Sequence, residues 1–342
     1  MNAVKLFAPG DLRIVDVERP TPGPGEALVQ VKAVGVCASD VHYFRDGRIG
    51  DAVLTEPLII GHEFAGVVAE VGPGVTNVRP GDRVAVEPGI PCYKCDLCAE
   101  GYHNLCRSIR FAGTPPHDGS MREYIAWPAQ LVEPIPDSMS MGEAAMLEPL
   151  AVGVYAVEIA GDVRGKTVGV LGAGAIGLSI LQAAKAAGCG ETFVTDVLPF
   201  RLDLAKELGA DHTSIAGPNV VDDVKQATGG RGLDVVFEAA GENEAVCQAT
   251  EMVRPAGMLV IGGIPREDVM TVTASVIRRK ALTIKMLRRS NNTLKKSIDL
   301  VAAGKINLAP FITHRFPLDR VVEAFQTARD RKDVSLRVVV EI

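Results

Sequence analysis

Four cysteines close together in the chain have the spacing of a metal-binding loop. They are Cys92, Cys95, Cys98 and Cys106, and they form the pattern C-x-x-C-x-x-C-x7-C. Thiolates with this spacing can converge tetrahedrally on one zinc ion, although a disulfide cluster or an iron–sulfur cluster could use the same residues. Because a zinc ion with four thiolate ligands has no open coordination position, we expect it to stabilise the loop and not to take part in catalysis.

A second chemical motif is a glycine-rich sequence that follows an apolar strand and opens a helix. It has the pattern G-x-G-x-x-G and consists of Gly172, Ala173, Gly174, Ala175, Ile176 and Gly177. The first glycine permits a tight turn, the second lets the backbone approach a pyrophosphate at the helix N-terminus, and the third allows close packing of helix and strand. The motif predicts a dinucleotide site formed by Gly172, Gly174, Ala175, Ile176 and Gly177, although a glycine-rich turn without a ligand can have the same pattern.

An acidic residue at the end of the next strand indicates which dinucleotide binds. Asp196 lies about 20 residues after the glycine motif, where a carboxylate accepts hydrogen bonds from the adenosine ribose hydroxyls. The same carboxylate would repel a 2′-phosphate, so the sequence favours NAD over NADP. We interpret Arg201 as a residue that lines the adenosine pocket, although its guanidinium could also pair with a phosphate.

The residue pattern around these motifs changes near residue 150. Before that point, short β-like runs are separated by Pro-Gly turns, which predicts a β-rich barrel. Afterwards strands and helices alternate, as in a parallel βαβ sheet, until a Val-rich strand at 336–340 that could rejoin the first domain. We therefore predict an α/β protein with two domains, one formed by residues 1–150 and 287–342 and the other, a doubly wound parallel sheet, by residues 151–286.

Composition and charge narrow the classes of partner. The chain has 342 residues, of which 47% are hydrophobic and 23% charged, enough apolar material for about two domains. The formal net charge of -6 would repel nucleic acid. No apolar run reaches the ~20 residues of a membrane span, and the first residues do not resemble a targeting peptide. We expect a small-molecule partner and a cytoplasmic location, with no nucleic acid and no membrane involved.

Three features occur in the order found in a known family. The run G-H-E-x-x-G-x5-G-x-x-V (61–75), the four-cysteine loop and the nucleotide motif together resemble the zinc-containing medium-chain dehydrogenases and reductases over nearly the whole chain. The segments 36–50, 114–119, 147–153 and 313–318 are most similar to its polyol dehydrogenases. The resemblance implies a GroES-like catalytic domain, a Rossmann NAD-binding domain and assembly into a homodimer or homotetramer.

The resemblance also implies a second, catalytic zinc ion, giving two per chain. It would lie near Cys37, His62 and Glu63, with Glu148 binding it directly or through water. A catalytic zinc keeps one position open, so a thiolate, an imidazole and a carboxylate are a suitable set of ligands. The alcohol dehydrogenase branch has a cysteine where this chain has Glu148, which leaves the third ligand open between Glu63 and Glu148. As a simpler alternative, Glu148 could merely favour the start of a helix.

Four further residues receive roles from the same resemblance. Ser39 would pass a proton from the substrate toward the cofactor ribose and His42, whose pKa suits exchange with solvent. Tyr43 and Arg288 would bind substrate hydroxyls or organise water near the zinc. The alternative for Tyr43 and Arg288 is an exposed side chain without a functional role.

The expected activity is oxidation of a secondary hydroxyl of a polyol similar to sorbitol or xylitol, with hydride transferred to NAD and a ketose as product. Threonine, 2,3-butanediol and hexonate are alternative substrates within the same family, the last because Arg288 and Arg289 could pair with a carboxylate. A catalytically inactive nucleotide-binding structural or regulatory protein is the alternative from another class.

Overall fold

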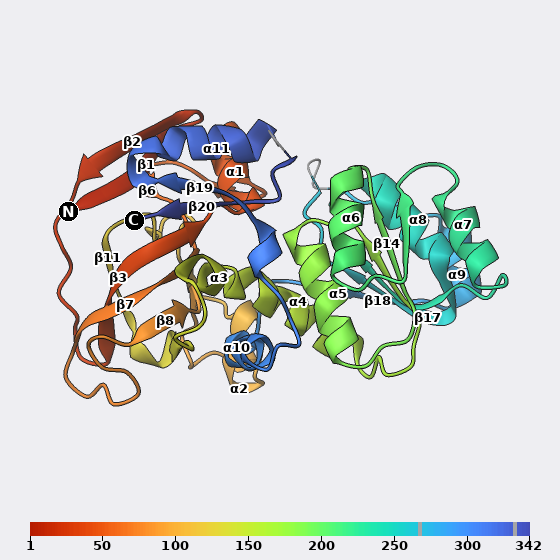
Figure 1. The fold of residues 1–342 in the computed structure, drawn as a ribbon, viewed down its shortest axis with the longest axis horizontal. Coiled ribbons are helices and arrows are strands. Elements are labelled where there is room, and N and C mark those ends of the chain that lie inside the picture. Colours follow the sequence, from red (N-terminus) through yellow and green to blue (C-terminus); the bar gives the residue numbers. More distant parts are fainter. Residues whose placement is uncertain (266–268, 331–333) are drawn as a thin grey trace. The chain divides into compact units, whose positions relative to one another are not determined.

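The computed structural model describes residues 1–265, 269–330 and 334–342. These residues form two compact units, Met1–Glu148 with Leu308–Ile342, and Pro149–Asn307 (Figure 1). No helix among them is both long and apolar enough to cross a membrane.

The first unit is built on a seven-stranded sheet in which β3 (Glu26–Gly35) is central. The strand order is β12-β8-β7-β3-β20-β19, and β11 also pairs with β3. A smaller sheet has the order β2-β1-β6. The strands of these two sheets are β1 (Asn2–Ala8), β2 (Asp11–Asp16), β6 (Leu58–Ile59), β7 (Glu63–Val71), β8 (Arg83–Val86), β11 (Tyr124–Pro128), β12 (Val132–Pro134), β19 (Ile312–Pro317) and β20 (Arg337–Glu341).

Short elements complete the first unit. The helices are α1 (Ala38–Asp46), α2 (Asp96–Ala99), α3 (Met141–Ala145), the first residues of α4 (Leu147–Ala160) and α11 (Val321–Asp330). The short strands are β4 (Arg48–Ile49), β5 (Ala52–Val53), β9 (Gly89–Ile90) and β10 (Arg110–Phe111).

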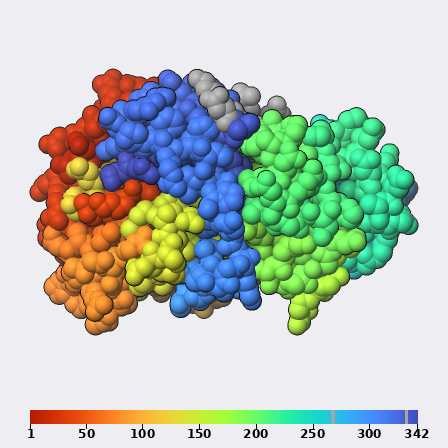
Figure 2. Space-filling view, in the orientation of Figure 1, coloured from red at the N-terminus to blue at the C-terminus, as the bar shows by residue number. Residues whose placement is uncertain are grey.

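The C-terminal strand returns to the first unit, as its sequence predicts. In β20, Val340 is opposite Val34 of β3 in an antiparallel pair. Helix α11 packs on α1, where the rings of Phe325 and Phe44 have centroids 5.4 Å apart. Figure 2 accordingly shows the blue C-terminal segment beside the red N-terminal strands of this unit. Buried valines of β3, β7 and β20 form the shared hydrophobic core.

The second unit is a six-stranded parallel sheet with the order β15-β14-β13-β16-β17-β18. This order, 3-2-1-4-5-6 along the chain, is that of the doubly wound Rossmann fold and confirms the predicted fold class. The strands are β13 (Val168–Leu171), β14 (Thr192–Asp196), β15 (His212–Ile215), β16 (Leu233–Glu238), β17 (Val253–Ile261) and β18 (Thr283–Met286).

Helices flank this sheet, with α5 and α6 on one side and α7, α8 and α9 on the other (Figure 1). They are α5 (Ala175–Ala186), α6 (Pro199–Glu207), α7 (Val220–Ala227), α8 (Asn243–Met252) and α9 (Ala274–Lys280), followed by α10 (Leu294–Ala302).

The sequence pattern predicted that residues 287–307 belong to the first unit, but the structure places them in the second. Their polar groups bind partners in the second unit. Thr293 Oγ1 donates to the carbonyl of Ala151 at 2.7 Å, and Gln182 exchanges two hydrogen bonds with the backbone of Asn307. These contacts join distant parts of the chain, so they leave no local sequence signal, and the boundary moves to residue 308.

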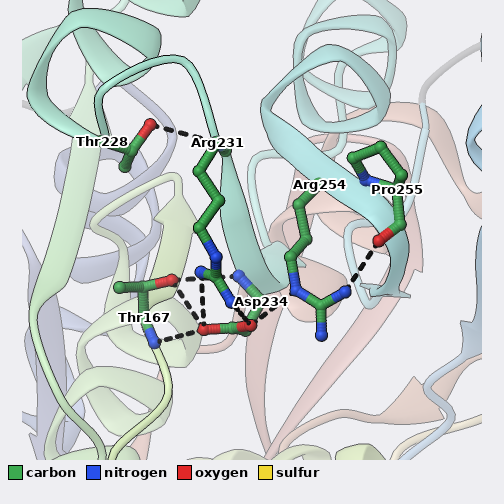
Figure 3. Close-up of polar contacts among 7 residues, drawn as sticks. Thr167, Thr228, Arg231, Asp234, Arg254 and Pro255 are labelled. Atoms are coloured by element: carbon green, nitrogen blue, oxygen red, sulfur yellow. Dashed lines mark hydrogen bonds and ion pairs between the residues drawn. The ribbon is translucent and has the colours of Figure 1, made fainter.

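A cluster of charged groups joins the strands at the amino end of the parallel sheet (Figure 3). Asp234 of β16 accepts hydrogen bonds from Thr167 N and Oγ1 at 3.0 Å, from Arg231 Nη2 at 2.7 Å and from Arg254 Nε at 2.6 Å. Burial would raise the pKa of Asp234, but the two guanidinium groups and Thr167 hold it well below its usual range.

Asp234→Asn is therefore expected to lower the free energy of unfolding by about 2 kcal/mol at neutral pH, because charge-assisted hydrogen bonds are lost. The folded-state pKa lies below the unfolded value of about 3.9, so this contribution is complete above that pH and disappears as the pH falls. Urea unfolding at pH 7 and near pH 3 measures the difference between the two proteins. A difference that stays constant over this range would contradict the assignment.

Candidate active site

The end of β3 and the start of β7 bring three potential metal ligands together. Gly35 is opposite Glu63 in the antiparallel pair, so Cys37, at the N-terminus of α1, comes close to His62. The thiol of Cys37, a ring nitrogen of His62 and a carboxylate oxygen of Glu63 all lie within 4.8 Å of one another. This donor set fits zinc with one coordination position left for a water or a substrate oxygen.

A buried carboxylate orients the histidine of this group. Asp40 Oδ1 lies 3.4 Å from His62 Nδ1, and the same side chain accepts hydrogen bonds from the backbone N–H groups of Cys37 and Gly61. Burial would lower the pKa of His62, but the charges of Asp40 and Cys37 raise it well above its usual range. An Nδ1–H bonded to Asp40 leaves Nε2 available to a metal, the usual arrangement of a carboxylate behind a histidine ligand.

A buried ion pair lies beside the metal-binding group. Arg337 Nη2 of β20 is 2.9 Å from Glu63 Oε1, with side chains only 7% and 0% exposed. Arg337 Nη1 also donates to the carbonyl of Val36. Burial would lower the pKa of Arg337, but the charge of Glu63 raises it above its usual range.

Of the two carboxylates left open by the sequence, Glu63 is the one in the group with Cys37 and His62. Glu148, in the first turn of α4, is also buried. Burial raises the pKa of Glu148 to about 8, against the opposing effect of His62. A carboxyl group with such a pKa can donate or accept a hydrogen bond near neutral pH.

The four-cysteine loop closes around one point. The sulfurs of Cys92 and Cys98, and those of Cys95 and Cys106, are 4.0 Å apart. A tetrahedral zinc site with Zn–S bonds of about 2.3 Å has sulfur separations of roughly 3.8 Å, so the loop fits the ion. Backbone N–H groups of Lys94 and Cys95 lower the pKa of Cys92 to about 6, which favours the thiolate that zinc requires.

Helix α1 carries the three residues expected to act in proton transfer and substrate binding. Ser39 Oγ lies 3.4 Å from His62 Nε2, beside the nitrogen available to a metal. His42 contacts Arg45 at 3.1 Å and lies 3.7 Å from Asp46, toward the C-terminal end of the helix. Tyr43 is only 3% exposed and packs in the hydrophobic core, so it is not an exposed side chain.

Three residues near the metal-binding group were not identified from the sequence. They are Asp40, Phe111, whose ring centroid lies 5.4 Å from that of His62, and Arg337. Asp40 had a local signal, because it is the third residue after the helix N-cap Cys37, where an acidic side chain closes a capping box. Phe111 and Arg337 are brought in by tertiary packing alone.

The glycine motif forms the turn between β13 and α5. Gly172 has a φ of 96°, and a β-carbon there would lie 2.8 Å from Ala240 N. A β-carbon on Gly177 would overlap the carbonyl oxygen of Gly172. Gly174 differs, because the nearest atom to a β-carbon there is Arg201 Nη1 at 3.8 Å. The protein's own packing does not require this glycine, but close approach of a pyrophosphate to the helix N-terminus would.

Asp196 ends β14 beside this turn. Its carboxylate accepts hydrogen bonds from Ala173 N at 2.7 Å and Leu198 N at 2.9 Å, and Arg201 Nη1 lies 3.4 Å from it. The structure thus brings Asp196 and Arg201 together at the carboxyl end of the sheet, where Rossmann folds bind nucleotides. Arg288, the remaining predicted site residue, is an exposed residue that follows β18 in the second unit, whereas the metal-binding groups lie in the first.

The fold and the metal-binding groups define a zinc-containing oxidoreductase with a nucleotide-binding domain, and comparison with known proteins agrees. Residues 23–137 match the alcohol dehydrogenase GroES-like domain, and residues 175–303 match the zinc-binding dehydrogenase family. Sorbitol dehydrogenase of Bacillus subtilis (strain 168) is 38% identical over 341 residues, covering 99% of this chain and 97% of that protein. Sorbitol dehydrogenase of Gallus gallus is 39% identical over 337 residues, covering 98% and 95%.

Solved structures have the same fold. An oxidoreductase of unknown specificity from Escherichia coli matches with a TM-score of 0.94 at 35% identity, covering 100% of this chain and 99% of that chain. A short chain alcohol dehydrogenase from E. coli CFT073, complexed with NADH, matches at 0.92 and 31% identity with the same coverage. The 2R,3R-butanediol dehydrogenase of B. subtilis matches at 0.89 and 31% identity, again over 100% and 99%.

The chain therefore belongs to the zinc-containing medium-chain dehydrogenases, as its motifs predicted. It is an alcohol or polyol dehydrogenase that uses zinc and a nicotinamide cofactor.

Proposed function

We propose that this enzyme oxidises a secondary hydroxyl next to the chain end of a polyol, such as sorbitol or xylitol, to a 2-ketose with NAD⁺. The observation that carries the proposal is the metal-binding group of Cys37, His62 and Glu63 with the buried carboxyl of Glu148 beside it. Full-length similarity to sorbitol dehydrogenases supports it. A site lined by carboxyl and hydroxyl groups favours a substrate with neighbouring hydroxyls, because an analogue without them leaves buried polar groups unpaired.

The roles of the residues follow from their positions. Zinc held by Cys37, His62 and a glutamate would supply a Lewis acid that lowers the pKa of a bound hydroxyl, and NAD⁺ would supply the hydride acceptor. Ser39, whose oxygen lies 3.4 Å from His62 Nε2, accepts the hydroxyl proton and releases its own toward the cofactor ribose and His42. His42, three residues further along α1 on the same side of the helix, passes the proton to solvent.

Three buried groups hold this arrangement or bind the substrate. Asp40 keeps the imidazole of His62 in one orientation, and Arg337 compensates the charge of Glu63. Glu148 binds a substrate hydroxyl or a water. We also retain Tyr43 and Arg288 as substrate-binding residues.

A panel of substrates tests the proposal. With NAD⁺, we expect kcat/KM for xylitol or sorbitol to exceed that for ethanol by at least about 10³-fold, because a site built to bind a hydroxyl discriminates strongly against its absence. The same panel includes 2R,3R-butanediol, threonine and a hexonate. If the enzyme clearly prefers one of these three compounds, that compound and not a polyol is its substrate. No turnover with any member of the panel would contradict the proposed reaction.

We propose that Asp196 makes NAD the preferred cofactor. Its carboxylate is buried at the site expected for the adenosine ribose, where it would repel a 2′-phosphate despite the adjacent Arg201. Asp196→Ala should raise KM for NAD⁺ and narrow the ratio of kcat/KM values for NAD⁺ and NADP⁺ by about tenfold or more, corresponding to about 1.4 kcal/mol of lost discrimination. If the unaltered enzyme uses NADP⁺ as well as NAD⁺, this assignment is wrong.

We propose that two copies of the chain associate through the edge of the parallel sheet. Strand β18 is the last strand of the sheet, and all four of its residues are exposed, including Ile284 and Met286. An exposed edge strand that carries apolar side chains is a ready template for pairing with another strand. Light scattering measures whether the particle in solution is a dimer or a tetramer, and a monomer would contradict the proposal.

A further inference from the structure

A buried glutamate at the carboxyl end of β16 has no role in the chemistry described above. Glu238 is only 1% exposed, whereas Leu171 and Ile261, at the same level of the two neighbouring strands, are apolar. Burial raises the pKa of Glu238, and hydrogen bonds from backbone N–H groups oppose this effect. Because an apolar side chain would fill the position without this desolvation cost, the carboxylate calls for an explanation beyond packing.

The Glu238 carboxylate joins two loops of the second unit. Oε1 accepts hydrogen bonds from Ala240 N at 2.8 Å and Gly241 N at 2.7 Å, in the loop after β16. Oε2 accepts a longer bond from Gly263 N at 3.2 Å, in the loop after β17. One side chain therefore holds the backbone of both loops.

The two loops pack backbone against backbone. A β-carbon on Gly263 would overlap Gly241 N and crowd Glu238 Oε2. On the other side, the loop after β16 touches the nucleotide motif, since Ala240 N is only 2.8 Å from the β-carbon position of Gly172. The loop after β16 therefore lies beside the turn that opens the nucleotide site.

The location of these loops indicates which part of the cofactor they face. A Rossmann sheet has two mononucleotide-binding halves that meet where the strand order reverses, here between β13 and β16. Asp196 ends β14 in the first half, which takes the adenosine. Glu238 and Ile261 end adjacent strands of the second half, so the loops after them face the nicotinamide nucleotide.

We propose that Glu238 is a positioning residue for the nicotinamide half of the cofactor, acting through the backbone of residues 240–241 and 263. The inference rests on the proposed function, in which NAD⁺ accepts the hydride. Glu238 touches neither the cofactor nor the substrate in this scheme. It holds two loops at the separation that the nicotinamide requires, and the adenosine half of the site does not depend on it.

Glu238→Gln tests the proposal, because it keeps the size of the side chain and replaces one acceptor oxygen by an NH₂ group that cannot accept a backbone N–H. We expect the dissociation constant of NADH to rise about 10-fold to 100-fold, as for loss of a charge-assisted hydrogen bond, and kcat with the best polyol to fall. The dissociation constant of AMP, which occupies the adenosine half, should change less than about twofold. Fluorescence titration with NADH and calorimetry with AMP measure the two constants.

Asp234→Asn is the matched control, because Asp234 lies in the same strand at the opposite end. It should lower stability and leave both dissociation constants unchanged. Gly263→Ala is a second test that retains the glutamate but forces the two loops apart. It should weaken the binding of NADH and leave the binding of AMP unchanged.

The possible outcomes distinguish failure of this proposal from failure of the proposed function. NADH binding by Glu238→Gln equal to that of the unaltered enzyme would overturn the proposal. An equal loss of affinity for NADH and AMP would also overturn the proposal, because such a result would indicate that Glu238 has only a general structural role. If the unaltered enzyme does not bind NADH, the proposed function itself fails.

Discussion

Replacing Cys37 with serine is expected to reduce turnover by about 10³-fold or more while the protein stays folded. The Lewis acid at an open zinc site contributes several kcal/mol to the transition state, and each 1.4 kcal/mol corresponds to a factor of ten. Serine is a poor zinc ligand at neutral pH, so the zinc content should fall from two ions per chain toward one. Turnover with the best polyol, metal analysis and thermal unfolding measure the three properties.

Two other cysteines provide the controls. Cys98→Ser removes a buried ligand of the four-cysteine loop, so it should release the other zinc ion and lower the unfolding temperature, because zinc binding to such a loop contributes folding free energy. Cys247→Ser, on α8, should change neither zinc content nor activity. A Cys37→Ser enzyme that keeps its activity, or an unaltered enzyme with one zinc per chain, would contradict the assignment of two sites.

Arg337→Ala is expected to destabilise the first unit strongly although it leaves the zinc ligands intact. It leaves Glu63 buried without its cationic partner, and breaking a buried ion pair in this way costs about 3–5 kcal/mol. Activity should fall as well, because Glu63 loses the guanidinium that holds its carboxylate next to Cys37 and His62. Urea unfolding of the zinc-loaded protein measures the change in free energy.

A neighbouring arginine provides the comparison for this prediction. Arg315 of β19 pairs with Glu341 of β20 at 3.1 Å, but both side chains are about half exposed. Arg315→Ala should cost less than about 1 kcal/mol, because exposed ion pairs contribute little. Similar losses for the two variants would show that the pair of Arg337 and Glu63 does not carry the stability assigned to it.

Features of the site that depend on neighbours in the chain could be read from the sequence. The four cysteines lie within fifteen residues, so their spacing alone predicts that they converge. The glycine motif follows a strand and opens a helix, and its conformation is determined by that turn. The alternation of strands and helices likewise indicates a parallel sheet, because each βαβ unit is a local structure.

Features that depend on distant residues were decided by tertiary structure. The resemblance placed Cys37, His62 and Glu63 at a zinc ion, but only the pairing of β3 with β7 brings them together in space. The partner of Glu63, Arg337, arrives with the C-terminal strand, and the segment 287–307 joins the second unit through contacts to distant residues. The spacing of residues in the sequence predicts a contact when a short loop can bring those residues together. The contacts of Glu63 with Arg337 and of residues 287–307 with the second unit form only after the two cores have folded and have aligned strands that are distant in the sequence.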